Sequence, residues 1–142
     1  MAQQIPSDFA EFMKRRESAA RAFINGDFGP SRPMLAEDAP ATFFDPWGGC
    51  HQGPAEVRDC YERNASLFAS GSCTFETLQL GADGRIGYWV FLQRGSVKLH
   101  GAADPIPASL RVTEVFRRDD GEWKLIHRHA DAPGSSLGPV AR

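Results

Sequence analysis

The fold is decided by residues 110–129, LRVTEVFRRDDGEWKLIHRH, near the end of the chain. Residues 109–118 and 123–130 are rich in β-branched and aromatic side chains that alternate with polar ones, a pattern typical of strands. The Asp-Asp-Gly tripeptide at 119–121 has the side chains of a tight hairpin turn. The pattern therefore predicts two neighbouring strands that pair in antiparallel fashion.

Two further strands are predicted upstream of this hairpin. Residues 74–80 and 85–94 have strand-like composition, and a hairpin-type turn at 82–84 joins them. The longer segment 95–108 contains glycines and two prolines. We expect it to form a wide loop with a short strand around 97–99.

The first half of the chain has helical periodicity instead. Apolar side chains recur at helical spacing over residues 7–25 and again over 54–70, and a short helix is expected within 28–37. Residues 42–44 are predicted as a strand, and the glycines of segment 48–53 indicate a loop.

Helices followed by strands that are joined by short turns indicate an α+β domain rather than alternating βαβ units. The chain has 142 residues, of which 42% are hydrophobic and 24% charged, as expected for one globular core. We predict a single domain over residues 1–132. The tail at 133–142 is rich in Gly, Ser and Pro and is predicted to be flexible, without core residues.

Charge and cysteine content exclude several classes of function. Sixteen basic and eighteen acidic residues give a net charge of −2, so no field favours nucleic acid or an acidic membrane. The N-terminus lacks the pattern of a signal peptide, which predicts a cytoplasmic protein. Cys50, Cys60 and Cys73 have no paired spacing, which argues against a disulfide framework or a zinc cage and favours small buried side chains.

The hairpin at 110–129 resembles the closing hairpin of SnoaL-like proteins, in the ketosteroid-isomerase-like and nuclear-transport-factor-like superfamily. Its tryptophan, two apolar residues and His-x-His are also similar to the association domain of calcium/calmodulin-dependent protein kinase. Residues 41–48, ATFFDPWG, with Gly53 downstream, are similar to the segment of ketosteroid isomerase that carries its general-base aspartate before a proline. Asp45 matches that aspartate, and Asn-Gly-Asp at 25–27 is a weaker match.

This resemblance covers roughly residues 8–131. It implies a cone-shaped, curved antiparallel sheet with the N-terminal helices packed over it, one small-molecule pocket, and a homodimer formed through the sheet face. It supplies no metal and no cofactor.

The chain departs from ketosteroid isomerase at both of its oxyanion donors. The tyrosine donor would fall at about Ala19, in a helix without tyrosine, and the protonated aspartic acid would fall within residues 113–115, where there is no Asp. Of that machinery the base alone is present. Steroid isomerisation by the same arrangement is therefore not expected.

Asp45 is the first candidate catalytic residue. A partly apolar pocket of Phe43, Trp47 and Trp89 would raise its basicity, so that it moves a proton next to a ligand carbonyl. The alternative is that Asp45, which precedes a proline at a strand end, is a turn residue.

Alternate residues of a strand share a face, so Arg111 lies on one side with Thr113, and His127 lies on one side with His129. If these sides are concave, they place a guanidinium, a hydroxyl and two imidazoles in the pocket, which suits an anionic or carbonyl ligand. His127 and His129 are candidate general acids or ligand donors, or alternatively structural or interface residues. Arg111 either binds a ligand carboxylate or forms a structural ion pair, with Asp45, Glu76 or Glu114 as candidates.

A metal site is a further alternative, because His-x-His with His51 or Asp131 as a third ligand is similar to some mononuclear sites. We predict no metal, since the sequence does not place that third ligand.

The sequence thus predicts a pocket protein that binds a small, partly apolar carbonyl or carboxylate compound, with or without isomerase-like or lyase-like proton transfer. The alternative is a non-catalytic association or ligand-sensing module.

Overall fold

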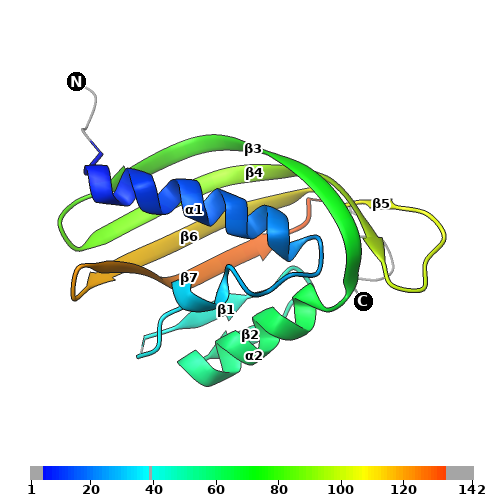
Figure 1. The fold of residues 1–142 in the computed structure, drawn as a ribbon, viewed down its shortest axis with the longest axis horizontal. Coiled ribbons are helices and arrows are strands. Elements are labelled where there is room, and N and C mark those ends of the chain that lie inside the picture. The colour runs from blue at the N-terminus through cyan, green and yellow to red at the C-terminus, as the bar shows by residue number, and fades with distance from the viewer. Residues whose placement is uncertain (1–4, 39, 134–142) are drawn as a thin grey trace.

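A computed structural model describes residues 5–38 and 40–133, so that residues 134–142 of the predicted tail lie outside the described residues. The elements in chain order are α1 (Ser7–Phe23), the short 3-10 helix η1 (Arg32–Met34), β1 (Thr42–Phe44), β2 (Cys50–Gln52), α2 (Pro54–Ala65), β3 (Phe68–Ala82), β4 (Ile86–Leu99), β5 (Ile106–Pro107), β6 (Leu110–Asp119) and β7 (Glu122–Asp131). Helix α1 lies across one face of a curved sheet, and α2 lies beside β1 and β2 (Figure 1). This arrangement confirms the predicted α+β fold. Within the described part of the chain, no helix is long and apolar enough to cross a membrane.

The sheet has the strand order β2-β1-β7-β6-β4-β3, and β5 pairs with β4. The pairs are antiparallel except that β1 runs parallel to β7, so the sheet is mixed rather than wholly antiparallel. Both predicted hairpins are present. The β6–β7 turn has Asp120 at φ 49° and Gly121 at φ 80°, the two positive φ angles that a type I′ turn requires.

The end of α1 is held against the start of β3 by a side chain. Asn25 Nδ2 donates to the Gly71 carbonyl at 3.0 Å, and Asn25 Oδ1 accepts from the Gly71 amide at 3.1 Å. A Cβ on Gly71 would lie 2.8 Å from the Ile24 carbonyl oxygen, so this position needs glycine for close approach. The Asn-Gly signal thus marks the end of the helix and also docks it on the sheet.

Four features differ from the sequence-based expectation, and one of them is the two-residue strand β5 within the segment expected as a wide loop. Helix α2 ends at Ala65 and β3 begins at Phe68, where the apolar stripe predicted continued helix. The short strand expected at 97–99 is the end of β4, which runs on to Leu99. The three-residue strand β2 was predicted as loop, because two polar side chains among three residues give no alternation to detect.

The core lies between α1, α2 and the concave face of the sheet, and it is strongly aromatic. Phe9 of α1 packs edge-on against Phe116 of β6 and Trp123 of β7, with ring centroids 5.8 and 4.8 Å apart. On β4, Trp89 stacks on Phe91 with centroids 3.5 Å apart. These contacts fix the helix over the sheet and so define its inner face.

A β-bulge in β7 changes which residues face this core. Val115 pairs with His127 but Phe116 pairs with Leu125, which leaves Ile126 as the extra residue. One extra residue reverses the alternation of a strand. Consequently the buried positions of β7 are Trp123 and Leu125 before the bulge, and Arg128 and Ala130 after it.

Candidate functional site

An internal cavity of about 70 Å³ lies between the helices and the curved end of the sheet. A single water molecule needs about 10–15 Å³ of cavity volume on the same measure, so this cavity has room for a small ligand. The residues that line it are Ala20, Phe23, Ile24, Phe43, Pro46, Trp47, Tyr61, Asn64, Phe68, Gln93, Val97, Leu99, Ile106, Ala108, Leu110 and Arg128. Most of this wall is apolar, and among the described residues that form it Arg128 is the one charged group.

Arg128 belongs to a buried cluster of charges. Glu114 on β6 accepts two hydrogen bonds from Arg16 on α1, at 3.0 Å from Nε to Oε1 and 2.7 Å from Nη2 to Oε2. Arg128 Nη1 donates to the same Oε2, and Arg16 Nη2 donates to the Tyr61 hydroxyl at 2.6 Å. The exposed fractions are 1% for Arg16, 0% for Glu114 and 8% for Arg128. The cluster is thus shielded from water.

The cluster carries a net positive charge. Burial alone would raise the pKa of Glu114, but Arg16 and Arg128 outweigh burial and hold that pKa below its usual range. Burial likewise opposes the charge on Arg16, and Glu114 overcomes it, so that the pKa of Arg16 is raised. Two guanidinium cations therefore face one carboxylate, and the cation in the cavity wall is Arg128.

Trp47 adds a hydrogen-bond donor to the same cavity wall. Its backbone amide donates to Asp45 Oδ1 at 2.8 Å, which fixes the residue at the β1–β2 turn. Its indole Nε1 is buried and has no hydrogen-bond partner among the residues that the structure describes. A buried donor without an acceptor is energetically costly.

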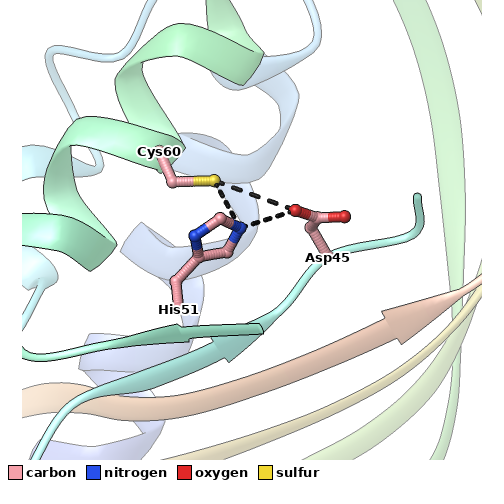
Figure 2. Close-up of side chains that lie close together, drawn as sticks. All are labelled: Asp45, His51 and Cys60. Carbon is pink, nitrogen blue, oxygen red and sulfur yellow. Dashed lines mark hydrogen bonds and ion pairs between the residues drawn. The ribbon is translucent and has the colours of Figure 1, made fainter. Parts of the chain in front are cut away.

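A second cluster, formed by Asp45, His51 and Cys60, lies at the β1–β2 turn beside α2 (Figure 2). Asp45 Oδ2 is 2.7 Å from His51 Nε2, and Cys60 Sγ is 3.2 Å from the same nitrogen. Burial alone would raise the pKa of Asp45, but hydrogen bonds from His51, Gly49 and Trp47 lower it. Burial, and then the charge of Asp45, raise the pKa of the Cys60 thiol.

Asp45 therefore sits in a different environment from the one that the sequence suggested. Its carboxylate is directed at His51 rather than into the cavity, and it is absent from the cavity wall (Figure 2). Its pKa is lowered, whereas a base activated by an apolar pocket needs a raised one. Its catalytic role stays a prediction, now without support from its surroundings.

The structure separates the predicted ligand-binding residues. Phe43 and Trp47 line the cavity, while Trp89 lies in the core and donates from Nε1 to Thr77 Oγ1 at 2.9 Å. Arg111 and Thr113 are exposed on the outer face of the sheet. Arg111 forms a structural ion pair, and its partner is Asp131, at 2.6 and 2.8 Å, rather than one of the acids named from the sequence.

His127 and His129 lie on this outer face as well, so they do not line the cavity beside Phe43 and Trp47; His129 instead borders a hollow on the outer face with Arg111 and Thr113. His129 is exposed, and half-buried His127 contacts Thr42 Oγ1 through Nδ1 at 2.6 Å. The ring of Phe44 lies edge-on to both, with centroids 5.1 and 5.3 Å away. The physical reason is the bulge at Ile126, which turns both imidazoles away from the core.

The inner charge cluster was missed, although part of its signal is in the sequence. Arg16 interrupts the apolar stripe of α1 between Met13 and Ala20, and Glu114 stands between buried Val112 and Phe116 on β6. Opposite charges within two apolar stripes indicate a buried ion pair. Arg128 had no such signal, because the bulge hides its inward position.

The potential metal ligands also group differently from the His-x-His alternative. Within residues 5–38 and 40–133, one set of three has all of its donor atoms within 4.8 Å of one another, and it consists of Asp45, His51 and Cys60. His127 and His129 are not in it.

A helix-covered, curved mixed sheet around an internal cavity is the architecture of the nuclear-transport-factor-like class. A family model described as the SnoaL-like domain matches residues 16–126, and the chain belongs to this family. No curated protein matches the sequence.

Solved structures agree with this assignment. A ketosteroid isomerase-like protein from Erwinia carotovora atroseptica has a TM-score of 0.72 at 12% identity, over 88% of this chain and 95% of that one. The hexachlorocyclohexane dehydrochlorinase LinA-type3 from Novosphingobium barchaimii has a TM-score of 0.71 at 14% identity, over 90% and 88%. A candidate calcium/calmodulin-dependent protein kinase type II association domain from Thiobacillus denitrificans has a TM-score of 0.68 at 13% identity, over 86% and 94%. At these identities the likeness shows the fold alone, and it confirms the predicted resemblance.

Proposed function

We propose that the protein binds a small, largely apolar compound in the internal cavity, and that a carboxylate or carbonyl oxygen of this compound contacts Arg128. The observation that carries the proposal is the buried cluster in which two arginines face one glutamate, with Arg128 in the cavity wall. The same wall holds the unpartnered indole donor of Trp47.

The charge imbalance makes an anion the favoured ligand. An uncompensated cation away from water is costly, and a ligand carboxylate that reaches Arg128 neutralises it. A carbonyl oxygen accepts a hydrogen bond from the same group but leaves the charge unbalanced, so it binds more weakly. The apolar wall contributes to affinity at about 25 cal/mol for each Å² of ligand surface that it buries.

Binding is better supported than catalysis. Of the described residues, those that line the cavity include neither a carboxylate nor an imidazole to serve as general base. One structural neighbour is a ketosteroid isomerase-like protein, and another is a hexachlorocyclohexane dehydrochlorinase. Hexachlorocyclohexane is a largely apolar compound, which supports an apolar ligand for this chain too. Proton transfer by Asp45 remains a prediction, to be checked by comparing proton exchange of bound acetophenone in the wild type and in Asp45→Asn.

The test of binding uses three probes that share one ring: benzoate, acetophenone and ethylbenzene. Calorimetric titration of the wild type should rank their affinities in that order. Arg128→Met should lower benzoate affinity at least tenfold and leave ethylbenzene unchanged, because it removes the excess cation while Glu114 stays paired with Arg16. Arg111→Met is the matched control, since this guanidinium lies on the outer face and pairs with Asp131.

Two results would contradict the proposal. One is a wild type that binds ethylbenzene as tightly as benzoate. The other is an Arg128→Met variant whose benzoate affinity equals that of the wild type.

A second candidate function is self-association through the outer face of the sheet. Leu78, Ile86 and Tyr88 are exposed there by 53%, 42% and 37%, an apolar surface of the kind that subunit interfaces cover. We propose a homodimer on this face, in agreement with the family resemblance. Light scattering should give twice the monomer mass for the wild type and a lower mass for Tyr88→Asp, and a monomeric wild type would exclude the dimer.

A further inference from the structure

We propose that Asp45, His51 and Cys60 form a mononuclear site for a borderline divalent metal ion such as Zn²⁺, with a water molecule or another small ligand in the fourth position. The three side chains come from the turn that follows β1, from β2 and from α2, and they converge on one point (Figure 2). The site is separate from the cavity, whose wall contains none of the three.

The distances between the donor atoms fit a single small cation. Asp45 Oδ2 and His51 Nε2 are 2.7 Å apart, Cys60 Sγ and His51 Nε2 are 3.2 Å apart, and Cys60 Sγ and Asp45 Oδ2 are 3.9 Å apart. Zinc bond lengths of about 2.0–2.3 Å in tetrahedral geometry separate neighbouring ligand atoms by about 3.3–3.6 Å. The three observed distances bracket this range, so small side-chain rotations suffice to admit an ion.

The chemistry of the donor set points in the same direction. One thiolate, one imidazole and one carboxylate are the ligand types that zinc accepts, and a soft sulfur ligand disfavours Mg²⁺ and Ca²⁺. Three protein ligands leave one position open, as in zinc sites that bind an exchangeable water.

Neighbouring groups hold each ligand by its other atom. Asp45 Oδ1 accepts hydrogen bonds from the Trp47 and Gly49 amides at 2.8 and 3.0 Å, which leaves Oδ2 for an ion. His51 Nδ1 lies 3.5 Å from Glu56 Oε2, and the same Oε2 accepts from the Gln52 amide at 3.1 Å. A carboxylate on the second ring nitrogen is the usual outer partner of a metal-bound histidine, because it orients the ring with Nε2 toward the metal.

Gly49 keeps the space over two of the ligand atoms open. A Cβ at this position would overlap Asp45 Oδ2 and would lie 2.7 Å from His51 Nε2. Gly49 is not among the glycines with positive φ, so it is the close approach that needs glycine here. The backbone therefore leaves room beside the two atoms that are to bind the ion.

The geometry favours a metal site over a cysteine nucleophile. A nucleophilic pair needs the thiol on one ring nitrogen and the orienting acid on the other. Here Cys60 and Asp45 contact the same nitrogen, and the negative Asp45 opposes a thiolate beside it. A divalent cation removes this conflict: the thiol proton is released to solvent, the neutral His51 ring keeps its proton on Nδ1, and the ion binds the thiolate, Nε2 and the carboxylate at once.

The test uses the full-length, untagged protein, made metal-free and titrated with Co²⁺ as a spectroscopic substitute for Zn²⁺. We expect one equivalent of bound Co²⁺, with a near-ultraviolet thiolate-to-cobalt charge-transfer band and the intense visible absorption of four-coordinate cobalt. Addition of Zn²⁺ should remove both signals. Cys60→Ser and His51→Gln should each weaken binding at least 100-fold.

Matched controls separate this site from adventitious binding. Cys73→Ser and His129→Gln alter residues of the same types that lie outside the set, so both should bind Co²⁺ as the wild type does. Gly49→Ala keeps all three ligands but fills the space between them, and it should weaken binding at least tenfold with an unchanged circular dichroism spectrum.

Several outcomes would overturn the proposal. These are a wild type that takes up no equivalent of Co²⁺, a complex without the thiolate band, binding that persists in Cys60→Ser, and binding that is lost instead in Cys50→Ser. If Cys60→Ser fails to fold, the Co²⁺ spectrum of the wild type and the Co²⁺ affinity of Gly49→Ala still test the proposal. Benzoate binding by the metal-free protein tests the cavity separately, so the two proposals can fail independently.

Discussion

Strands β6 and β7 carry two ion pairs between directly opposed residues, one on each face of the sheet. Glu114 opposes Arg128 on the inner face, and Arg111 opposes Asp131 on the outer face. The chemistry is the same, but Glu114 is fully buried, whereas the side chain of Arg111 is 63% exposed. The comparison teaches that burial, rather than the pairing itself, decides how much each pair contributes to stability and whether it can attract a ligand.

The inner pair is buried, and its negative charge does not balance the positive charges around it. Arg16 joins it from α1, so the inner face ties the helix to the sheet and retains an unneutralised cation at the cavity. The outer pair, Arg111 with Asp131, has no net charge and is screened by water, so it needs no further counter-ion. A site for an anion therefore forms on one face and not on the other.

Removal of one partner from each pair should show the largest contrast. Glu114→Ala leaves Arg16 and Arg128 buried without a counter-ion, and we expect it to lower the free energy of unfolding by about 3–5 kcal/mol. Asp131→Ala should have the same midpoint of urea unfolding as the wild type. Urea unfolding followed by circular dichroism measures both.

A similar loss in the two variants would show that burial does not control these pairs. If Glu114→Ala does not fold, Glu114→Gln keeps the shape and removes the charge. It should fold, with a lower free energy of unfolding than the wild type.

The sequence predicted the elements of the fold better than the faces of its strands. Turn residues and periodicity identified α1 and both hairpins, since these signals are local. The start of β3 at Phe68 was missed, because an apolar residue at helical spacing after Ala65 fits either structure.

The sites were predicted less well, for a physical reason. The inward position of Arg128 depends on the bulge at Ile126, which arises from pairing with β6 and leaves no mark in β7 itself. The approach of His51 and Cys60 to Asp45 depends on the strand β2, which the sequence did not reveal. Contacts between distant segments lie outside what periodicity reports.

Two glycines of β4 and its preceding turn give a second, smaller contrast between covered and open positions. A Cβ on Gly87 would lie 2.6 Å from the ring of Phe9, whereas no atom of the described residues lies within 4 Å of one on Gly84. Gly87→Ala overpacks the contact between α1 and the sheet, so we expect a loss of about 1–3 kcal/mol in the free energy of unfolding. Urea unfolding should show Gly84→Ala close to the wild type, and equal effects of the two would contradict this account of the core.

The smallest expected effect is the pH dependence contributed by the outer face. Burial, and then the nearby His129, lower the pKa of His127 below the 6.5 of a free histidine. Below pH 6.5 the unfolded chain therefore binds a proton that the folded chain resists, so the free energy of unfolding falls as the pH decreases through this region. Above that pH both states are neutral at this position, and the effect vanishes.

His127→Gln should accordingly flatten the slope of unfolding free energy against pH between about 7 and 5.5. His129→Gln removes one of the two causes of the shift and should flatten the slope less. Urea titrations at fixed protein concentration measure all three slopes. If the slope for His127→Gln equals that of the wild type, this account is wrong. His127 would then bind a proton as readily in the folded chain as in the unfolded one, as expected for a side chain fully exposed to water.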